Sequence, residues 1–376
     1  MKKIKVLVVD DSALMRKIIS DMIKEDSSIE VIGTARNGQD LMDKLSSDFY
    51  KTMPDVITMD VEMPKMDGIT ALGELKKKNI NIPVIILSSI SKEGTKLTME
   101  CLAAGAFDFL PKPSGTISLD IDKVKVELIQ KIKVAYYSIS NQNSPINIGG
   151  LENKSYKEIA TVRILDENTK KTEDTRKTIE RKFQAGRIDA VVMGASTGGP
   201  KALTSVITEL PKDIGVPVFV VQHMPVGFTR AFAERLNSSS HVEVVEAQEG
   251  MKAQSNVVYI APGGYHMEVW NDKKIHLNKE PAIWGVRPAV DKLFISASRV
   301  YKGNIVSVVL TGMGKDGAEG TVEIKKNGGI TISQDKDTCT IYGMPKVAYE
   351  TGKVDLVLPL NDISKEVLKI ITSGRR

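Results

Sequence analysis

The sequence lacks the features that mark several large classes of protein. It contains two cysteines, Cys101 and Cys339, which lie far apart in the chain, so no disulfide framework is predicted. No apolar run approaches the length of a membrane-spanning helix, and the N-terminus leads straight into a predicted strand without a signal-peptide core. We therefore expect a cytoplasmic protein that is not inserted in a membrane.

A strong excess of one charge is also missing. The formal net charge is +5 over 376 residues, and the basic side chains are spread along the chain. This distribution gives no sign of a nucleic-acid partner, although it suits an acidic protein surface. With 41% hydrophobic and 26% charged residues, the chain has an ordinary globular composition and is long enough for two domains.

Residues 1–137 alternate between short apolar runs and segments of helical periodicity. Such alternation predicts a parallel sheet that helices cover on both faces. The predicted strands are 5–9, 29–35, 56–59, 84–87 and 107–110.

Polar residues gather where four of these strands end. Asp10 and Asp11 follow the first strand, Asp60 the third and Ser88 the fourth, and Lys112 comes after the fifth. Carboxyl ends of parallel strands share one edge, where converging carboxylates would repel each other without a cation, and their hard oxygens suit Mg²⁺. A lysine and a hydroxyl could hold a phosphoryl group beside it. The plainer alternative is that the two aspartates only cap a helix.

Residues 138–186 lose this pattern and become rich in turn-forming and charged residues, which is typical of a linker. A second α/β alternation covers residues 187–376 and predicts a mostly parallel sheet with an antiparallel hairpin at 265–277. Its strands are predicted at 190–193, 216–222, 242–247, 257–261, 304–310, 330–333 and 354–358. Its helices are predicted at 200–210, 226–237, 288–301, 315–327 and 361–372.

The stretch from Gly194 to Gly198 is a Gly-x-Ser-x-Gly sequence between a predicted strand and a predicted helix. This arrangement is typical of a nucleophile elbow, which would expose the hydroxyl of Ser196. The glycines do not fit a P-loop, because Pro200 stands where a lysine is needed, and the next strand does not end in the acidic residue of a dinucleotide site. A serine that merely caps the helix remains the alternative.

A catalytic serine needs a base and an acid. His223 ends the strand after that of Ser196, and sequential parallel strands are usually neighbours, so the two should face each other. Asp316 lies in a glycine-rich loop that also exposes the backbone N–H of Met313, which could serve an oxyanion. Asp291, in a predicted helix, is the alternative acid, and His266 is the second histidine candidate and could line the pocket.

The first region resembles a two-component receiver domain. The residues that carry the resemblance are Asp10-Asp11, Asp60 with Met63-Pro64 and Gly68, Ser88, and Lys112-Pro113. The resemblance implies a doubly wound, flavodoxin-like fold in which Asp60 accepts a phosphoryl group from a histidine kinase. It also implies Mg²⁺ held by Asp11, Asp60 and the Glu62 carbonyl, with Asp10 acting through water. Ser88 and Phe109 would be the switch pair, and Lys112 would contact the phosphoryl group.

The second region resembles the catalytic domain of chemotaxis protein-glutamate methylesterases. The resemblance rests on five segments: 194–200, 222–225, 261–264 with His266, 287–291 and 310–318. It implies hydrolysis of γ-glutamyl methyl esters, and deamidation of glutamines, on cytoplasmic helices of chemotaxis receptors. Ser196 would be the nucleophile, His223 the base and Asp316 its orienting acid. Backbone N–H groups at Thr197 and Met313 would hold the oxyanion, and the esterase step would need no metal or other cofactor.

Two domains joined by a loose linker suggest regulation. The hypothesis is that the unphosphorylated receiver covers the esterase site and that phosphorylation of Asp60 exposes it. Two other classes remain open: a DNA-binding response regulator, which a gel shift with random DNA would reveal, and a binding module without turnover. A comparison of methanol release between wild type and Ser196→Ala would distinguish the binding module from the enzyme.

Overall fold

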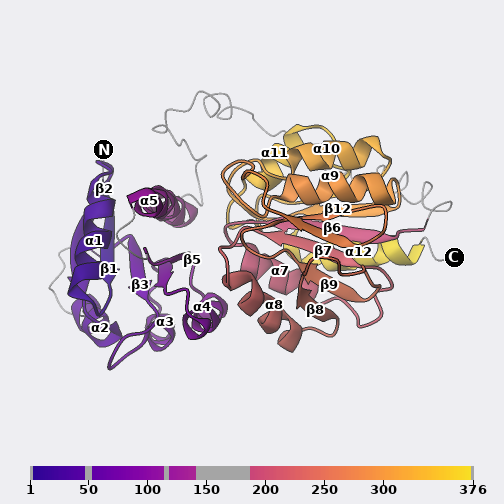
Figure 1. The fold of residues 1–376 in the computed structure, drawn as a ribbon. Helices are drawn as coiled ribbons and strands as arrows, with labels where there is room; N and C mark the ends of the chain where they lie inside the picture. Colours follow the sequence, from indigo (N-terminus) through magenta and orange to yellow (C-terminus); the bar gives the residue numbers. More distant parts are fainter. Residues whose placement is uncertain (1–2, 47–52, 114–117, 141–186, 374–376) are drawn as a thin grey trace. The chain divides into compact units, whose positions relative to one another are not determined.

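The structure is a computed structural model, and it describes residues 3–46, 53–113, 118–140 and 187–373. These residues form two compact units, and each unit has its own parallel sheet (Figure 1). None of the helices in the described ranges is long and apolar enough to cross a membrane.

The first sheet has the strand order β2-β1-β3-β4-β5, and its strands pair in parallel throughout. Its strands are β1 (Ile4–Val9), β2 (Ile29–Ala35), β3 (Val56–Asp60), β4 (Val84–Ser88) and β5 (Asp108–Pro111). The connecting helices are α1 (Ala13–Lys24), α2 (Gly38–Ser46), α3 (Gly68–Lys77) and α4 (Lys92–Ala104), and α5 (Ser118–Ser140) follows β5. This order confirms the predicted doubly wound, flavodoxin-like fold.

The predicted linker begins later than expected. Helix α5 continues through residues 138–140, because its apolar positions keep helical spacing and bury Leu128, Ile132 and Ala135 in the core of the first unit. The rest of the predicted linker, residues 141–186, lies outside the described residues.

The second unit is built on a seven-stranded sheet with the order β14-β13-β12-β6-β7-β9-β8. Its strands are β6 (Ala190–Ala195), β7 (Val218–Gln222), β8 (Glu243–Glu246), β9 (Val257–Ile260), β12 (Ile305–Val309), β13 (Ile330–Gln334) and β14 (Leu356–Leu358). The strand pairings within this sheet are all parallel, and β10 (His266–Val269) and β11 (Ile275–Asn278) form a separate antiparallel hairpin. The predicted mostly parallel sheet with a hairpin is therefore confirmed.

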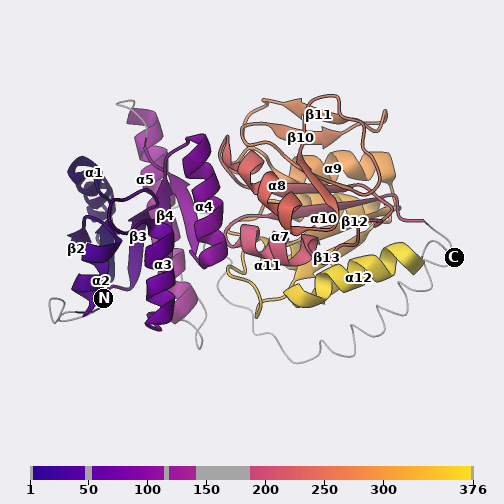
Figure 2. The same cartoon turned by 90° about the horizontal axis from the view of Figure 1, so that it is seen from below.

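Helices cover both faces of this sheet. One layer holds α9 (Val290–Tyr301), α10 (Ala318–Lys326) and α11 (Met344–Glu350), and the other holds α7 (Gly199–Ile207), α8 (Phe228–Ser239) and α12 (Leu360–Ser373) (Figures 1 and 2). Helix α11 was not predicted, because seven residues that begin at a Met-Pro pair are too few to show helical periodicity. The hairpin packs on α9.

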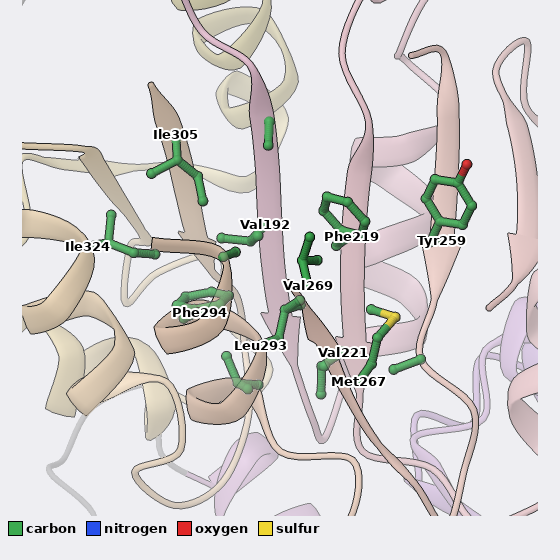
Figure 3. Packing of buried hydrophobic residues seen from close by; sticks show 14 of the residues in the cluster. Val192, Phe219, Val221, Tyr259, Met267, Val269, Leu293, Phe294, Ile305 and Ile324 are labelled. Atoms are coloured by element: carbon green, nitrogen blue, oxygen red, sulfur yellow. The ribbon is translucent and has the colours of Figure 1, made fainter. Parts of the chain in front are cut away.

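The core of the second unit lies between the sheet, α9 and the hairpin (Figure 3). Phe219 of β7 and Phe294 of α9 are fully buried, and Met267 and Val269 bring the hairpin into the same cluster. Burying a side chain of this size contributes about 1.5–3 kcal/mol. The packing fixes the start of α9 against the sheet, which becomes important for the site described below.

The strand order of the second sheet reverses at β6. The chain runs from β6 to β7 on one side and later returns to β12 on the other side of β6. In parallel α/β sheets such a reversal leaves a crevice at the carboxyl ends of the strands, where ligands bind. Ser196, His223 and the loop that holds Asp316 follow these three strands.

Candidate functional sites

The first candidate site lies at the carboxyl ends of β1 and β3. The ammonium of Lys112 lies 2.6 Å from Asp60 Oδ2 and 2.8 Å from Asp10 Oδ2. Ligand oxygens of Asp10, Asp11 and Asp60 lie within 4.8 Å of one another, which is compact enough to share one cation. Three carboxylates are the hard oxygen ligands that Mg²⁺ prefers, so these residues fit the metal that the sequence predicts.

The pKa of the Asp60 carboxyl is raised well above its usual value. Burial raises the pKa of Asp60 to about 6, the charge of Asp10 adds to the increase, and the hydrogen bond and charge of Lys112 oppose it. Its Oδ1 also accepts a hydrogen bond from the Val61 N–H at 2.7 Å. A bound cation would favour the ionised carboxylate that a phosphoacceptor must present.

The remaining residues predicted for this site surround it. Ser88 is buried at the end of β4, and its carbonyl accepts a hydrogen bond from the Lys112 N–H at 2.8 Å, which fixes the lysine's backbone. Phe109 is buried on β5 and pairs with Ile86 of β4, two residues before Ser88. Glu62 exposes its side chain to solvent, so its predicted role rests on its backbone carbonyl.

The second candidate site begins at Ser196, directly after β6. Its N–H donates to the Thr311 carbonyl at 3.0 Å, and its carbonyl accepts from the Gly199 N–H at 2.7 Å, where α7 begins. The loop after β12 lies against it, because a Cβ on Gly312 would come within 2.8 Å of the Ser196 Cβ. Only glycine allows this approach, which brings the loop that holds Asp316 to the serine.

His223 follows β7 at the matching position. The β6–β7 register pairs Ala195 with Gln222, and the His223 N–H donates to the Ala195 carbonyl at 3.1 Å. Ser196 and His223 are therefore the first residues beyond two paired strand ends, which confirms the predicted adjacency of their strands. No hydrogen bond joins the Ser196 hydroxyl to the imidazole among the residues that the structure covers.

Asp316 is the acid that reaches the imidazole. Its Oδ2 lies 2.8 Å from His223 Nε2, which leaves Nδ1 as the other ring nitrogen. The carboxylate also accepts hydrogen bonds from the N–H groups of Val290 at 2.6 Å and Asp291 at 2.9 Å, at the start of α9. A helix N-terminus stabilises an anion in this position.

These contacts decide the charge of Asp316, which is 2% exposed. Burial alone would raise the pKa of Asp316, but the hydrogen bond and charge of His223 and the two backbone N–H groups outweigh it, so the pKa is lowered. The carboxylate can therefore stay ionised beside a protonated imidazole.

Asp291, the alternative acid, is used elsewhere. It accepts hydrogen bonds from the N–H groups of Gly317 at 2.9 Å and Gly320 at 2.8 Å, at the start of α10, and from Trp284 Nε1 at 3.2 Å. Burial first, and then the charge of Asp316, raise the pKa of Asp291 to about 7. The two aspartates cap each other's helices, and the structure brings Asp316, not Asp291, to His223.

Thr197 and Met313 carry the two backbone N–H groups that the sequence analysis expects to hold an oxyanion. Thr197 is buried directly after the serine, and Met313 is next to Gly312, the residue that touches Ser196. Neither backbone N–H has a hydrogen-bond partner among the described residues. Both therefore remain available to a ligand.

His266, the second histidine candidate, is buried inside the domain. Its side chain is fully buried, Nδ1 accepts from the Ala289 N–H at 3.2 Å, and Nε2 donates to the Pro281 carbonyl at 3.1 Å. Burial lowers the pKa of His266 and keeps the ring neutral. The ring thus braces the segment that leads into α9.

Two buried residues to which the sequence analysis gave no role hold the site together. The Gln222 side-chain amide donates to the carbonyls of Ser196 at 3.0 Å and His223 at 3.2 Å. The Thr311 hydroxyl accepts from the Ile341 N–H at 2.9 Å and lies 3.1 Å from the Thr197 carbonyl. The sequence did contain a pattern that could have identified them, since each is a polar residue at the end of an apolar strand in the centre of the sheet.

Two families match this chain, each over one of the two parallel sheets. The family described as "CheB methylesterase" matches residues 191–367, and the "Response regulator receiver domain" matches residues 6–121.

Full-length relatives agree with these matches. A protein from Clostridium acetobutylicum named "Protein-glutamate methylesterase/protein-glutamine glutaminase" is 56% identical, with 100% of both chains covered. A relative of the same name from Pyrococcus horikoshii is 44% identical and covers 98% of this chain and 94% of its own.

Solved structures of single domains are also similar. The "CheB methylesterase catalytic domain" of Thermotoga maritima is 44% identical over 49% of this chain and 98% of its own, with a TM-score of 0.48. The "response regulator domain" of Thermotoga maritima CheB is 44% identical over 36% of this chain and 97% of its own, with a TM-score of 0.32.

Proposed function

Because the chain belongs to the protein-glutamate methylesterase/protein-glutamine glutaminase family and carries a receiver domain before its methylesterase domain, we propose that it is a serine hydrolase switched on by phosphorylation. Its substrates are glutamate methyl esters, and glutamines, on cytoplasmic helices of chemotaxis receptors. The observation that carries the proposal is the hydrogen bond between His223 and the ionised Asp316, formed one strand away from Ser196.

In the first step, the Ser196 hydroxyl attacks the ester carbonyl while His223 takes its proton. Since Nε2 of His223 faces Asp316, Nδ1 is the nitrogen that accepts this proton once a side-chain rotation brings it to the Ser196 hydroxyl. The negative charge of Asp316 stabilises the imidazolium that results, and Asp316 itself stays ionised.

The negative charge on the former carbonyl oxygen is held by the backbone N–H groups of Thr197 and Met313. Each such donor contributes ~3 kcal/mol to transition-state stabilisation in comparable sites. Collapse of the tetrahedral intermediate breaks the ester C–O bond, and the imidazolium returns its proton to the leaving methanol. For a glutamine side chain the leaving group is ammonia.

The second half restores the enzyme. Water attacks the glutamyl ester on Ser196, His223 accepts a proton from the water, and the same two N–H groups hold the oxyanion. Release of the serine oxygen takes that proton back and leaves a glutamate carboxylate on the receptor. No metal or other cofactor enters this scheme.

Regulation is assigned to the receiver. Asp60 accepts the phosphoryl group from a chemotaxis histidine kinase, with Lys112 and Ser88 near the phosphoryl oxygens and Phe109 as the second switch residue. Asp10, Asp11, Asp60 and the Glu62 carbonyl would hold Mg²⁺, which supplies positive charge against the phosphoryl oxygens when bound.

The proposed domain boundaries are 1–137 for the receiver, 138–186 for the linker, into whose first three residues α5 extends, and 187–376 for the esterase domain, all on the cytoplasmic side. The receiver is proposed to restrain the esterase until Asp60 is phosphorylated. If fragment 187–376 were no more active than the unphosphorylated full chain, this restraint would not exist.

The central experiment measures methanol release from methylated receptor membranes. Wild type, Ser196→Ala and Asp60→Asn are compared with and without a small phosphodonor and Mg²⁺. We expect a donor-dependent increase in wild type, none in Asp60→Asn, and almost no release in Ser196→Ala. Equal rates in wild type and Ser196→Ala would eliminate the serine mechanism.

A further inference from the structure

Trp284 occupies a backbone conformation that a large side chain rarely adopts. Trp284 and Gly285 form a two-residue turn, with φ values of +54° and +82°, between Ile283 and Val286. The N–H of Ile283 donates to the Val286 carbonyl at 3.1 Å, and the reverse bond measures 3.0 Å. Asparagine, aspartate and glycine prefer the first position of such a turn. A tryptophan there indicates that tertiary contacts hold its side chain.

These contacts lead to the loop of the proposed triad acid. The Lys315 ammonium lies 3.5 Å from the centroid of the Trp284 ring. On its other side, Trp284 Nε1 donates to Asp291 Oδ2 at 3.2 Å, and Asp291 Oδ1 accepts from the Gly317 N–H at 2.9 Å. The residues directly before and directly after Asp316 are therefore both tied to Trp284.

The loop needs such support. Gly314 and Gly317 flank Asp316 with φ values of +96° and +94°, so the backbone on either side has little stiffness of its own. Asp316 must nevertheless keep its carboxylate within 2.8 Å of His223 Nε2. A shift of about 1 Å in a catalytic group can cost about 100-fold in rate.

We propose that Trp284 is a positioning residue for Asp316. It holds Lys315 through a cation–π contact and Gly317 through Asp291, and so keeps the Asp316 carboxylate on His223. This inference rests on the proposed function, in which His223 and Asp316 act together. No hydrogen bond or ring contact joins Trp284 to Ser196 or His223, all three of which the structure describes, so its effect on the reaction passes through Asp316.

Two substitutions separate the contacts. Trp284→Phe keeps an aromatic face for Lys315 but removes the indole N–H that donates to Asp291. Trp284→Ala removes both the aromatic face and the N–H. Trp270→Ala is the matched control, because Trp270 is exposed to a similar degree (53%, against 48% for Trp284) but stacks on His276 of the hairpin.

The assay is steady-state methanol release by the full chain on methylated receptor membranes, with a phosphodonor and Mg²⁺. We expect Trp284→Ala to lower kcat about tenfold and Trp284→Phe by an intermediate factor, with KM within about twofold of wild type, because transition-state positioning is lost and ground-state binding is not. Trp270→Ala should keep the wild-type kcat.

The second readout is the downfield proton NMR signal of the His223–Asp316 hydrogen bond in the full chain. We expect it to broaden or vanish in Trp284→Ala and to persist in Trp270→Ala. The proposal would be overturned if Trp284→Ala kept the wild-type kcat, whether or not its KM rose. It would also be overturned if Trp270→Ala lowered kcat as much as Trp284→Ala does. If Trp284→Ala does not fold, Trp284→Phe decides by the same two measurements.

The failure of this inference can be distinguished from failure of the proposed function. If methanol release by wild type did not depend on Ser196, the proposed function would fail. The NMR signal would still report whether Trp284 holds Asp316 on His223, because it needs no turnover.

Discussion

The chain contains two sites where buried carboxylates meet at the carboxyl edge of a parallel sheet, and the two sites treat the charge differently. At Asp60, burial raises the pKa to about 6, and a neighbouring carboxylate adds to the increase. At Asp316, burial acts in the same direction, yet the pKa is lowered because His223 and two backbone N–H groups at the start of α9 outweigh it.

The difference shows that the donors around a buried carboxylate, more than its burial, decide its charge. The Asp60 site has three carboxylates and one ammonium, so it lacks positive charge and suits a cation and a phosphoryl group. At the second site, the Asp316 carboxylate already has hydrogen bonds from His223 and from two backbone N–H groups. The first centre is therefore suited to respond to a ligand and the second to keep one fixed charge through a reaction.

The largest expected effect is a loss of esterase activity that leaves phosphorylation of the other site unchanged. Ser196→Ala should lower methanol release by ~10⁵-fold, because a triad without its nucleophile keeps only background catalysis. Phosphorylation of Asp60 from a small phosphodonor should be unchanged, and Ser205→Ala, on the same helix α7, should behave as wild type. Residual release above about one per cent of wild type would mean that another group is the nucleophile.

The next prediction concerns the fixed charge. Asp316→Asn should lower kcat by roughly 10³- to 10⁴-fold, because an amide cannot hold the imidazole in the productive tautomer or stabilise its charge. Asp291→Asn is the matched control and should cost far less, since Asp291 does not contact His223. Steady-state methanol release measures both. A larger loss in Asp291→Asn would reverse the assignment of the acid.

The third prediction concerns the ligand-responsive centre. Asp60→Asn should abolish the rise in esterase rate that a phosphodonor and Mg²⁺ produce and should leave the basal rate near that of wild type. A tenfold rise corresponds to only ~1.4 kcal/mol between the two states, so the effect is smaller than those of the triad variants. Asp21→Asn, at an exposed position on α1, should keep the full rise. A donor-dependent rise in Asp60→Asn would place the phosphoacceptor elsewhere.

The smallest expected effect is on stability. The native pKa of Asp60, about 6, lies above the reference value of 3.8, so the folded state binds this proton more tightly than the unfolded state. Ionised Asp60 therefore costs stability above pH 6, and the cost disappears as the pH falls towards 4. Asp60→Asn should raise Tm by about 2–5 °C at pH 7.5, and the gap should shrink as the pH falls from about 6 towards about 4.

Calorimetry of the full chain, following the transition that Mg²⁺ shifts in wild type, measures this gap. Asp21→Asn again serves as the control. A lower Tm for Asp60→Asn at pH 7.5, or a gap that does not change with pH, would show that the Lys112 contacts outweigh the burial of the charge.

Much of both sites could be predicted because parallel strands impose a simple rule. A polar residue that follows a buried strand lies at the carboxyl edge, and strands that follow each other are usually neighbours. This rule suffices for Ser196 beside His223, whereas Asp10 lies beside Asp60 because β3 pairs with β1 and not with β2, the strand that precedes it in the chain. It needs only the apolar pattern of each strand, which local sequence carries.

Contacts between side chains and distant backbone could not be predicted in this way. Asp316 and Asp291 each lie near a predicted helix start, so the sequence favoured Asp316 as the acid but kept Asp291 as an alternative. The choice depends on which helix N-terminus faces which carboxylate, and this follows from how α9 and α10 pack. The burial of His266 has the same origin, since its partners lie in the segment before α9.

The sequence by itself determined the two α/β units, the order of their strands along the chain and the residues that end those strands, because hydrophobic periodicity and turn chemistry are local properties. Only the tertiary structure decided which ring nitrogen of His223 meets Asp316, why that carboxylate keeps its charge, and how Trp284 reaches its loop. These depend on donors brought together from distant parts of the chain, and packing of the folded chain alone fixes their distances.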